Sequence, residues 1–74
     1  MEELFVIATR GRNNKEIYLK CSDKESKNKI LMEWTENINE AMATFNYIEI
    51  NDYAKNYFKN FNKWYITSYS AKFN

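Results

Sequence analysis

The chain has 74 residues and a formal net charge of +1; it contains no histidine or proline, one cysteine and one glycine, but two tryptophans, six tyrosines and five phenylalanines. This length predicts a single domain over residues 1–74, with a thin core. The near-neutral charge argues against a general nucleic-acid binder, which would be clearly basic, and against a DNA mimic, which would be strongly acidic.

The cysteine content and the N-terminal residues bear on the cellular compartment. Cys21 has no second cysteine in the chain with which to form a disulfide, and a lone thiol suits a reducing environment. The first residues, Met-Glu-Glu-Leu, are acidic where a secretory leader would be basic. No apolar stretch approaches the roughly 20 residues that a membrane-spanning helix needs. We therefore expect a cytoplasmic protein with no membrane partner.

The N-terminal half of the sequence predicts a β-hairpin followed by a third strand. Residues 4–9 form a continuous apolar and β-branched run, and residues 16–21 alternate between apolar and polar side chains, as strands do. Gly and Asn at 11–14 are typical of the turn between them. Residues 22–29 are polar and predict a long loop, after which residues 29–34 predict the third strand.

The C-terminal half predicts one main helix and a closing strand. Thr35 is expected to cap a short helical turn over residues 36–38. Asn46 is a suitable cap for the main helix, and Glu49 completes a capping-box-like pair. Apolar side chains then recur at helical spacing: Ile50, Tyr53, Ala54, Tyr57 and Phe58. Asn60 or Asn62 is expected to end this helix, and residues 63–69 predict the last strand.

The element order β-β-β-α-β predicts an α+β fold, in which a three- to four-stranded antiparallel sheet carries one main amphipathic helix on one face. A single face of the sheet receives the helix, so the large side chains on that face should meet in one core. The side chains expected in this core are Trp34, Phe45, Tyr57 or Phe58, and Trp64 or Ile66.

The residue types of most active sites and metal centres are missing from the chain. There is no histidine, and Gly11 stands alone, so there is no glycine-rich phosphate loop. Cys21 alternates with Ile17 and Leu19, which places it on the apolar face, where a buried structural cysteine is favoured over a nucleophile. We expect a protein without enzymatic activity, metal or cofactor, which works by binding.

Carboxylates gather between residues 33 and 52, a stretch without a basic residue. They are Glu33, Glu36, Glu40, Glu49 and Asp52. The first three could serve as an acid–base pair or hold a divalent cation, but an exposed acidic face is the better interpretation at this spacing. Such a face either remains solvated or docks on a basic partner, where its charges would mainly speed and orient association.

A second candidate surface lies on the sheet face that points away from the helix. Tyr18 alternates away from Ile17 and Leu19, and the tyrosines of the last strand alternate away from its apolar residues. Together with nearby cations the set is Arg10, Arg12, Tyr18, Lys20, Tyr65 and Tyr69. It could form a stacking platform for single-stranded nucleic acid. The favoured alternative is cross-strand packing in a thin sheet, and a protein partner is favoured over nucleic acid.

The sequence also resembles a known group of proteins over most of its length. The sequence resembles a layout in small accessory proteins of phages and prophages of AT-rich Gram-positive bacteria. The parts that carry the resemblance are the stretch 33–41, Phe45, the helix with residues 53–58 and the start of the last strand at 63–66. There a hairpin leads to a Trp-Thr-x-x-Ile/Leu-x-x-Ala turn, an amphipathic helix and a closing strand. The resemblance brings no catalytic residues.

Proteins of this group are often inhibitors of bacterial defence systems, anti-CRISPR proteins among them. The resemblance therefore implies a phage-encoded inhibitor that occludes a functional surface of a host defence protein, such as a CRISPR–Cas nuclease, in the cytoplasm of an infected bacterium. The alternatives are a small nucleic-acid-binding accessory protein and a self-associating structural or regulatory phage subunit. In the last case an unpaired edge strand would allow a homodimer to form.

Overall fold

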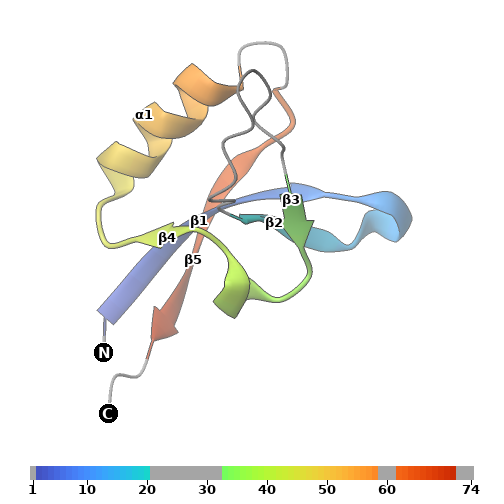
Figure 1. The fold of residues 1–74 in the computed structure, drawn as a ribbon, viewed down its shortest axis with the longest axis horizontal. Coiled ribbons are helices and arrows are strands. Elements are labelled where there is room, and N and C mark those ends of the chain that lie inside the picture. Colours follow the sequence, from blue (N-terminus) through green and yellow to red (C-terminus); the bar gives the residue numbers. More distant parts are fainter. Residues whose placement is uncertain (1, 21–32, 59–61, 72–74) are drawn as a thin grey trace.

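A curled antiparallel sheet of five strands carries one helix across one face (Figure 1). The computed structural model describes residues 2–20, 33–58 and 62–71. The strands are β1 (Glu2–Arg10), β2 (Glu16–Lys20), β3 (Glu33–Thr35), β4 (Ala43–Thr44) and β5 (Tyr65–Ala71), the helix is α1 (Tyr47–Tyr57), and two short 3-10 helices are η1 (Arg12–Asn14) and η2 (Ile38–Glu40). The predicted α+β class, with one helix on an antiparallel sheet, is confirmed.

β1 is the central strand of the sheet. β5 pairs with residues 2–8 of β1, so this pairing occupies one edge of β1. The other edge is shared, because β4 lies opposite Phe5 and Val6 while β2 lies opposite residues 8–10. β3 pairs with β2 and extends the sheet on that side. The backbone N–H of Met42 donates to the carbonyl of Leu19 at 2.9 Å, which holds the start of β4 against the end of β2.

The hairpin and its turn form where the sequence predicts them. Asn13 and Asn14 take positive φ values of 63° and 59°, a conformation that asparagine tolerates better than most residues. Gly11 does not use its conformational freedom, since its φ is −86°. Residues 21–29, which include Cys21 and the predicted polar loop, lie outside the described residues, as do residues 29–32 of the predicted third strand.

Two local predictions are wrong in detail, and one strand is not predicted from the sequence. Thr35 does not cap a helical turn at 36–38: η2 begins at Ile38, and the cap is Asn37, whose side chain accepts from the N–H of Asn39 at 3.0 Å. Thr35 forms the preceding turn, since its Oγ1 accepts from the N–H of Asn37 at 3.0 Å. β4 was not expected, because a strand of two residues is too short to show an alternating pattern. β5 covers residues 65–71 rather than 63–69.

The N-terminus of α1 matches the prediction and its C-terminus does not. Asn46 caps the helix, and its Oδ1 accepts from the N–H of Glu49 at 3.2 Å. The helix ends at Tyr57, before Asn60 or Asn62, and Phe58 leaves helical geometry with φ −101° and ψ 73°. The N–H of Phe58 still donates to the carbonyl of Ala54 at 2.9 Å, so the chain turns away with its ring held against the sheet.

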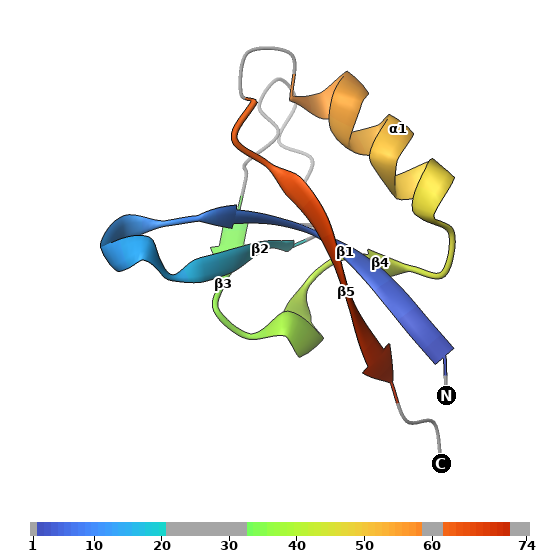
Figure 2. The same ribbon diagram turned by 180° about the vertical axis from the view of Figure 1, so that it is seen from behind.

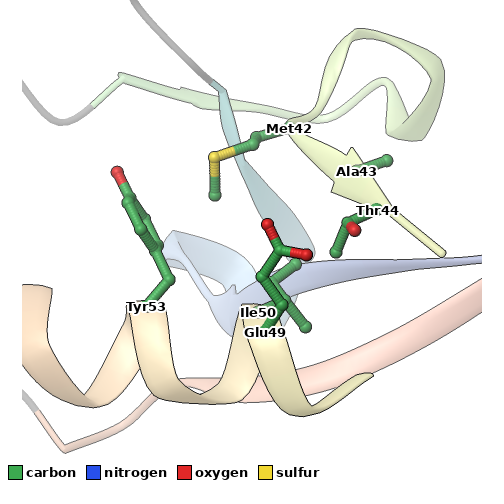
Figure 3. Close-up of a pocket in the computed structure, with 6 residues that line it drawn as sticks. All are labelled: Met42, Ala43, Thr44, Glu49, Ile50 and Tyr53. Atoms are coloured by element: carbon green, nitrogen blue, oxygen red, sulfur yellow. The ribbon is translucent and has the colours of Figure 1, made fainter. Parts of the chain in front are cut away.

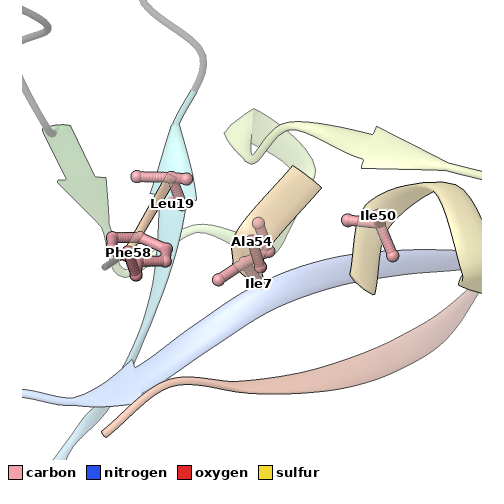
Figure 4. Packing of buried hydrophobic residues seen from close by; sticks show 5 residues of the cluster. All are labelled: Ile7, Leu19, Ile50, Ala54 and Phe58. Atoms are coloured by element: carbon pink, nitrogen blue, oxygen red, sulfur yellow. The ribbon is translucent and has the colours of Figure 1, made fainter. Parts of the chain in front are cut away.

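The core lies between α1 and the face of the sheet that α1 covers (Figure 4). Its buried side chains are Ile7, Leu19, Ile50, Ala54 and Phe58. The ring of Phe58 stacks with Trp34 on β3 at 6.1 Å and with Trp64 at 6.2 Å between ring centroids. Tyr57 and Ile66 pack against the same cluster. The aromatic rings thus link the C-terminal end of α1 to the sheet, as the periodicity predicts.

Phe45 is the exception to the predicted core, because 56% of its surface is exposed. It lies between β4 and the Asn46 cap, where the Oγ1 of Thr44 accepts from the N–H of Asn46 at 3.2 Å and shapes a tight connection. This connection turns the Phe45 ring outward. Phe5 and Met42 pack against the core cluster in its place.

We expect Phe58→Ala to lower the free energy of unfolding by about 3–5 kcal/mol, because it leaves a cavity between two tryptophan rings. One core of this size supplies roughly 3–5 kcal/mol in total, so the variant should be largely unfolded at room temperature. Urea denaturation followed by tryptophan fluorescence measures the difference. Glu36→Ala, at an exposed position, should remain within about 0.5 kcal/mol of wild type. A cooperative Phe58→Ala transition near the wild-type midpoint would contradict this assignment of the core.

Candidate functional site

Large apolar side chains remain exposed around the beginning of α1. Among the described residues they are Phe45, Tyr47, Ile48 and Tyr53, with exposed fractions of 56%, 50%, 70% and 43%. The helix explains the most exposed of them: Ile48 precedes buried Ile50 by two residues, about 200° around the helix axis. Such a concentration of apolar surface on one segment is typical of an interaction site.

A pocket of about 270 Å³ opens between α1 and the β4 segment (Figure 3). Its lining residues are Met42, Ala43, Thr44, Glu49, Ile50 and Tyr53. Figure 3 shows Glu49 and Tyr53 rising from α1 toward Met42 and Thr44. Small-molecule sites usually measure about 300–1,000 Å³, so this pocket fits one large side chain of a partner better than a whole cofactor.

The register of β4 explains why this space stays open. Ala43 pairs with Val6 and so lies on the face away from α1, while Thr44 pairs with Phe5 and is the β4 side chain on the α1 side. Ile50 is 2% exposed and closes the bottom of the pocket. Tyr53 was predicted in the core stripe; it instead borders the pocket and stacks on Tyr57 at 5.5 Å between ring centroids.

The half of α1 that borders the pocket is acidic. Glu49 lies in the first turn and lines the pocket, Asp52 follows three residues later, and the basic residue of the helix, Lys55, lies in its last turn. Residues three apart on a helix are neighbours, so the two carboxylates lie near each other. The result is an apolar pocket with negative charge at its rim.

The predicted acidic residues lie in two groups. Glu49 and Asp52 belong to α1, whereas Glu33, Glu36 and Glu40 belong to β3, η2 and the turn between them, which Figure 1 shows away from the start of α1. Within the second group, Glu33 lies opposite Lys20 across the β2–β3 pair. The Oε2 of Glu40 accepts from the Oγ1 of Thr35 at 3.1 Å. Of these five carboxylates, Glu49 is the one that lines the pocket.

The tyrosines of the alternative surface come together on the face away from α1. Tyr18 on β2 and Tyr65 on β5 lie on either side of Ala8 in the sheet register, and Tyr69 lies opposite Leu4. Ala8 and its neighbour on this face, Val6, have no exposed surface. The rings therefore lie beside a second buried layer, as the packing alternative expects.

A carboxylate lies between the two central tyrosines. The hydroxyl of Tyr18 donates to Glu16 Oε1 at 2.8 Å, and the hydroxyl of Tyr65 donates to Glu16 Oε2. The hydrogen bond from Tyr65, followed by that from Tyr18, lowers the pKa of Glu16 below its ordinary value of 4.5. The pKa of Tyr18 is raised mainly by its hydrogen bond to Glu16, and that of Tyr65 by burial and then by the same carboxylate.

Two of the three cations of this surface lie opposite acidic residues. Arg10 pairs across the sheet with Glu16, and Lys20 pairs with Glu33. Arg10 also donates from Nη1 to the carbonyl of Asn14 at 3.2 Å, while Arg12 lies exposed in η1. Sequence reasoning missed Glu16, although its place opposite Arg10 in the hairpin was a usable signal. The surface therefore carries its own counter-charges, which weakens its attraction for phosphate.

Within the parts of the chain that the structure describes, no three potential metal ligands among His, Cys, Asp and Glu gather at one point. No described helix has the length and apolar character required to cross a membrane. Comparison of the chain with protein families, with curated proteins and with solved structures finds no significant match.

The Glu16–tyrosine hydrogen bonds predict how stability depends on pH. Because the pKa of Glu16 is lowered, its hydrogen bonds add to the free energy of unfolding above pH 4.5. This stabilisation is lost as the pH falls through the pKa of Glu16 in the folded protein. The raised pKa values of Tyr18 and Tyr65 mean that their contribution is present below pH 10.0 and is lost as the pH rises. At neutral pH, Tyr65→Phe should lower the free energy of unfolding by about 1 kcal/mol.

Carbon-13 NMR titration of the Glu16 carboxyl checks the cause of this effect. Tyr65→Phe should move the Glu16 pKa up toward 4.5, and the stability difference from wild type should shrink in acid. Tyr69→Phe is the matched control, because Tyr69 lies four residues further along the same face, and it should leave the Glu16 titration unchanged. An unaltered Glu16 titration in Tyr65→Phe would disprove the interaction.

Proposed function

We propose that this protein acts by binding another protein through the β4–α1 surface, which consists of the pocket residues together with exposed Phe45 and Tyr47. The observation that carries the proposal is that the large exposed apolar side chains of the described residues all lie within 45–53, next to a pocket the size of one side chain. Interfaces are commonly built from such aromatic anchors around a pocket.

The lining of the pocket defines the chemistry of the partner. An aliphatic or aromatic side chain of the partner fills the space between Met42 and Ile50, and full burial of one such side chain is worth about 1.5–3 kcal/mol. Glu49 at the rim favours a lysine or arginine beside that anchor. This charge pair mainly orients the complex and speeds its formation, while the apolar contact supplies most of the affinity.

Protein recognition is better supported than nucleic-acid recognition. A platform for single strands needs rings that can stack on bases and cations that can reach phosphates. Tyr18 and Tyr65 are instead hydrogen-bonded to Glu16, a carboxylate that would repel phosphate. The rings of Phe45, Tyr47 and Tyr53 on the β4–α1 surface are 56%, 50% and 43% exposed.

The resemblance to phage accessory proteins suggests a specific partner. A basic nucleic-acid channel of a host defence protein, such as a CRISPR–Cas nuclease, offers the cations that Glu49 and Asp52 would meet, and a protein seated there would occlude the channel. We propose this inhibitory role on the resemblance together with the acidic rim of the pocket. The preference for an apolar anchor beside a basic residue applies to any protein partner.

A peptide library tests the chemistry of the partner without knowledge of its identity. Randomised peptides selected on the immobilised protein should share an apolar or aromatic residue next to Lys or Arg. Glu49→Lys should weaken the selected peptides by roughly tenfold, since it replaces an attraction by a repulsion at a partly exposed site. Isothermal titration calorimetry measures the affinities, and NMR shift changes at the Met42 methyl and the Ala43 amide report the place of binding.

Glu36→Lys is the matched control, because it makes the same charge change at an exposed residue outside the pocket lining. It should bind the selected peptides as wild type does. Equal weakening by both variants would indicate a general charge effect and reject the proposed site. Peptides that bind without shifting the Met42 and Ala43 signals would reject it as well.

A further inference from the structure

β5 is a long strand at the edge of the sheet. It pairs with β1 over seven residue pairs, from Glu2↔Ala71 to Ala8↔Tyr65, and among the described strands it has no other neighbour. Figure 2 shows it on the near side of the molecule, with β1 behind it. One row of its backbone N–H and C=O groups therefore faces away from the described sheet and has the geometry to receive another strand.

This edge lacks the features that usually prevent strand addition. Proteins protect exposed edges with charged side chains, proline, bulges or very short strands. The sequence of β5, Tyr-Ile-Thr-Ser-Tyr-Ser-Ala, has seven residues and contains no charge, proline or glycine. The edge at β3 is different, since that strand has three residues and begins with exposed Glu33. Among the described strands, β5 is therefore better suited than β3 to receive an added strand.

We propose that β5 pairs antiparallel with β5 of a second copy of this chain and forms a two-fold symmetric homodimer. Full overlap of the two strands places Ser68 at the symmetry axis and sets Thr67 opposite Tyr69 of the second copy. Pairs of an aromatic and a β-branched side chain stabilise antiparallel sheets. The same edge is used in both copies, so the assembly closes at two chains.

The side chains on both faces of β5 are compatible with the pairing of two β5 strands. On the α1 side, Ser68 and Ser70 are small and exposed, so they leave room for the second copy. On the other side, Tyr65, Thr67 and Tyr69 are half-buried and would gain contacts across the axis. A strand added here pairs through its backbone and must be extended. β5 of a second copy is extended over seven residues and brings no charged side chain to the interface.

The dimer leaves the β4–α1 surface accessible. β5 lies on one edge of β1, whereas β4 lies on the opposite edge. The assembly therefore presents two copies of the pocket, and its existence does not depend on the function proposed for that pocket. A bivalent protein would bind a partner with repeated sites more tightly than a monomer.

Sedimentation velocity over a dilution series tests the dimer. Wild type should change from dimer to monomer on dilution. Ser68→Lys places two like charges opposite each other at the axis and should raise the dimer dissociation constant by roughly tenfold or more. Asn39→Lys adds the same charge in η2, at an exposed residue, and should dimerise like wild type. Circular dichroism confirms that both variants are folded.

Amide hydrogen exchange provides an independent measurement on the unmodified chain. Alternate amides of β5 should be protected at high protein concentration and lose this protection on dilution, while the amides of β1 remain protected. A monomer mass at every concentration would overturn the proposal. So would a dimer that Ser68→Lys leaves intact, growth into larger assemblies, or β5 protection that appears only when a different protein is added.

Discussion

The structure depends on the burial of residues 6–9 of β1. Val6, Ile7 and Ala8 have no exposed surface, and Thr9 is 5% exposed. A strand can reach this state only if both of its edges are paired and both of its faces are covered, because an unpaired buried backbone group is costly. β5 pairs with one edge and β2 with β4 share the other. Thr9 satisfies its buried hydroxyl by donating from Oγ1 to the carbonyl of Lys63 at 2.9 Å.

The two faces of β1 are covered by different chemistry, and this difference separates the candidate surfaces. Ile7 faces α1 and the aromatic stack around Phe58, so this side is apolar. Val6 and Ala8 face the side where Tyr18 and Tyr65 share the Glu16 carboxylate. Through these hydrogen bonds the Glu16 side chain joins β2 to β5 across β1, and such a network stabilises a thin sheet without a second helix. The tyrosines therefore have a structural role that accounts for their alternation.

The shared edge of β1 also explains the candidate binding surface. β2 occupies residues 8–10 of that edge, and β4 pairs only with Phe5 and Val6 before the chain leaves the sheet for α1. The chain must then turn sharply into α1, and this turn places Phe45 and the first helical turn in solvent. Thr44 is the β4 side chain on the α1 side, so a pocket remains between β4 and α1, and the amphipathic pattern of α1 puts Glu49 at its rim. The apolar and acidic features of the surface thus follow from one topological arrangement.

The sequence by itself determined the features that depend on neighbouring residues. The hairpin, the Asn46 cap and the Ile50–Ala54–Phe58 stripe follow from alternation, side-chain capping and helical spacing, and each is present in the structure. Tertiary structure alone decided that Phe45 lies outside the core, that β4 exists and that Met42 and Tyr53 border one pocket. These features depend on which strands share an edge of β1. Pairing between distant segments leaves no periodic signal in a stretch as short as two residues.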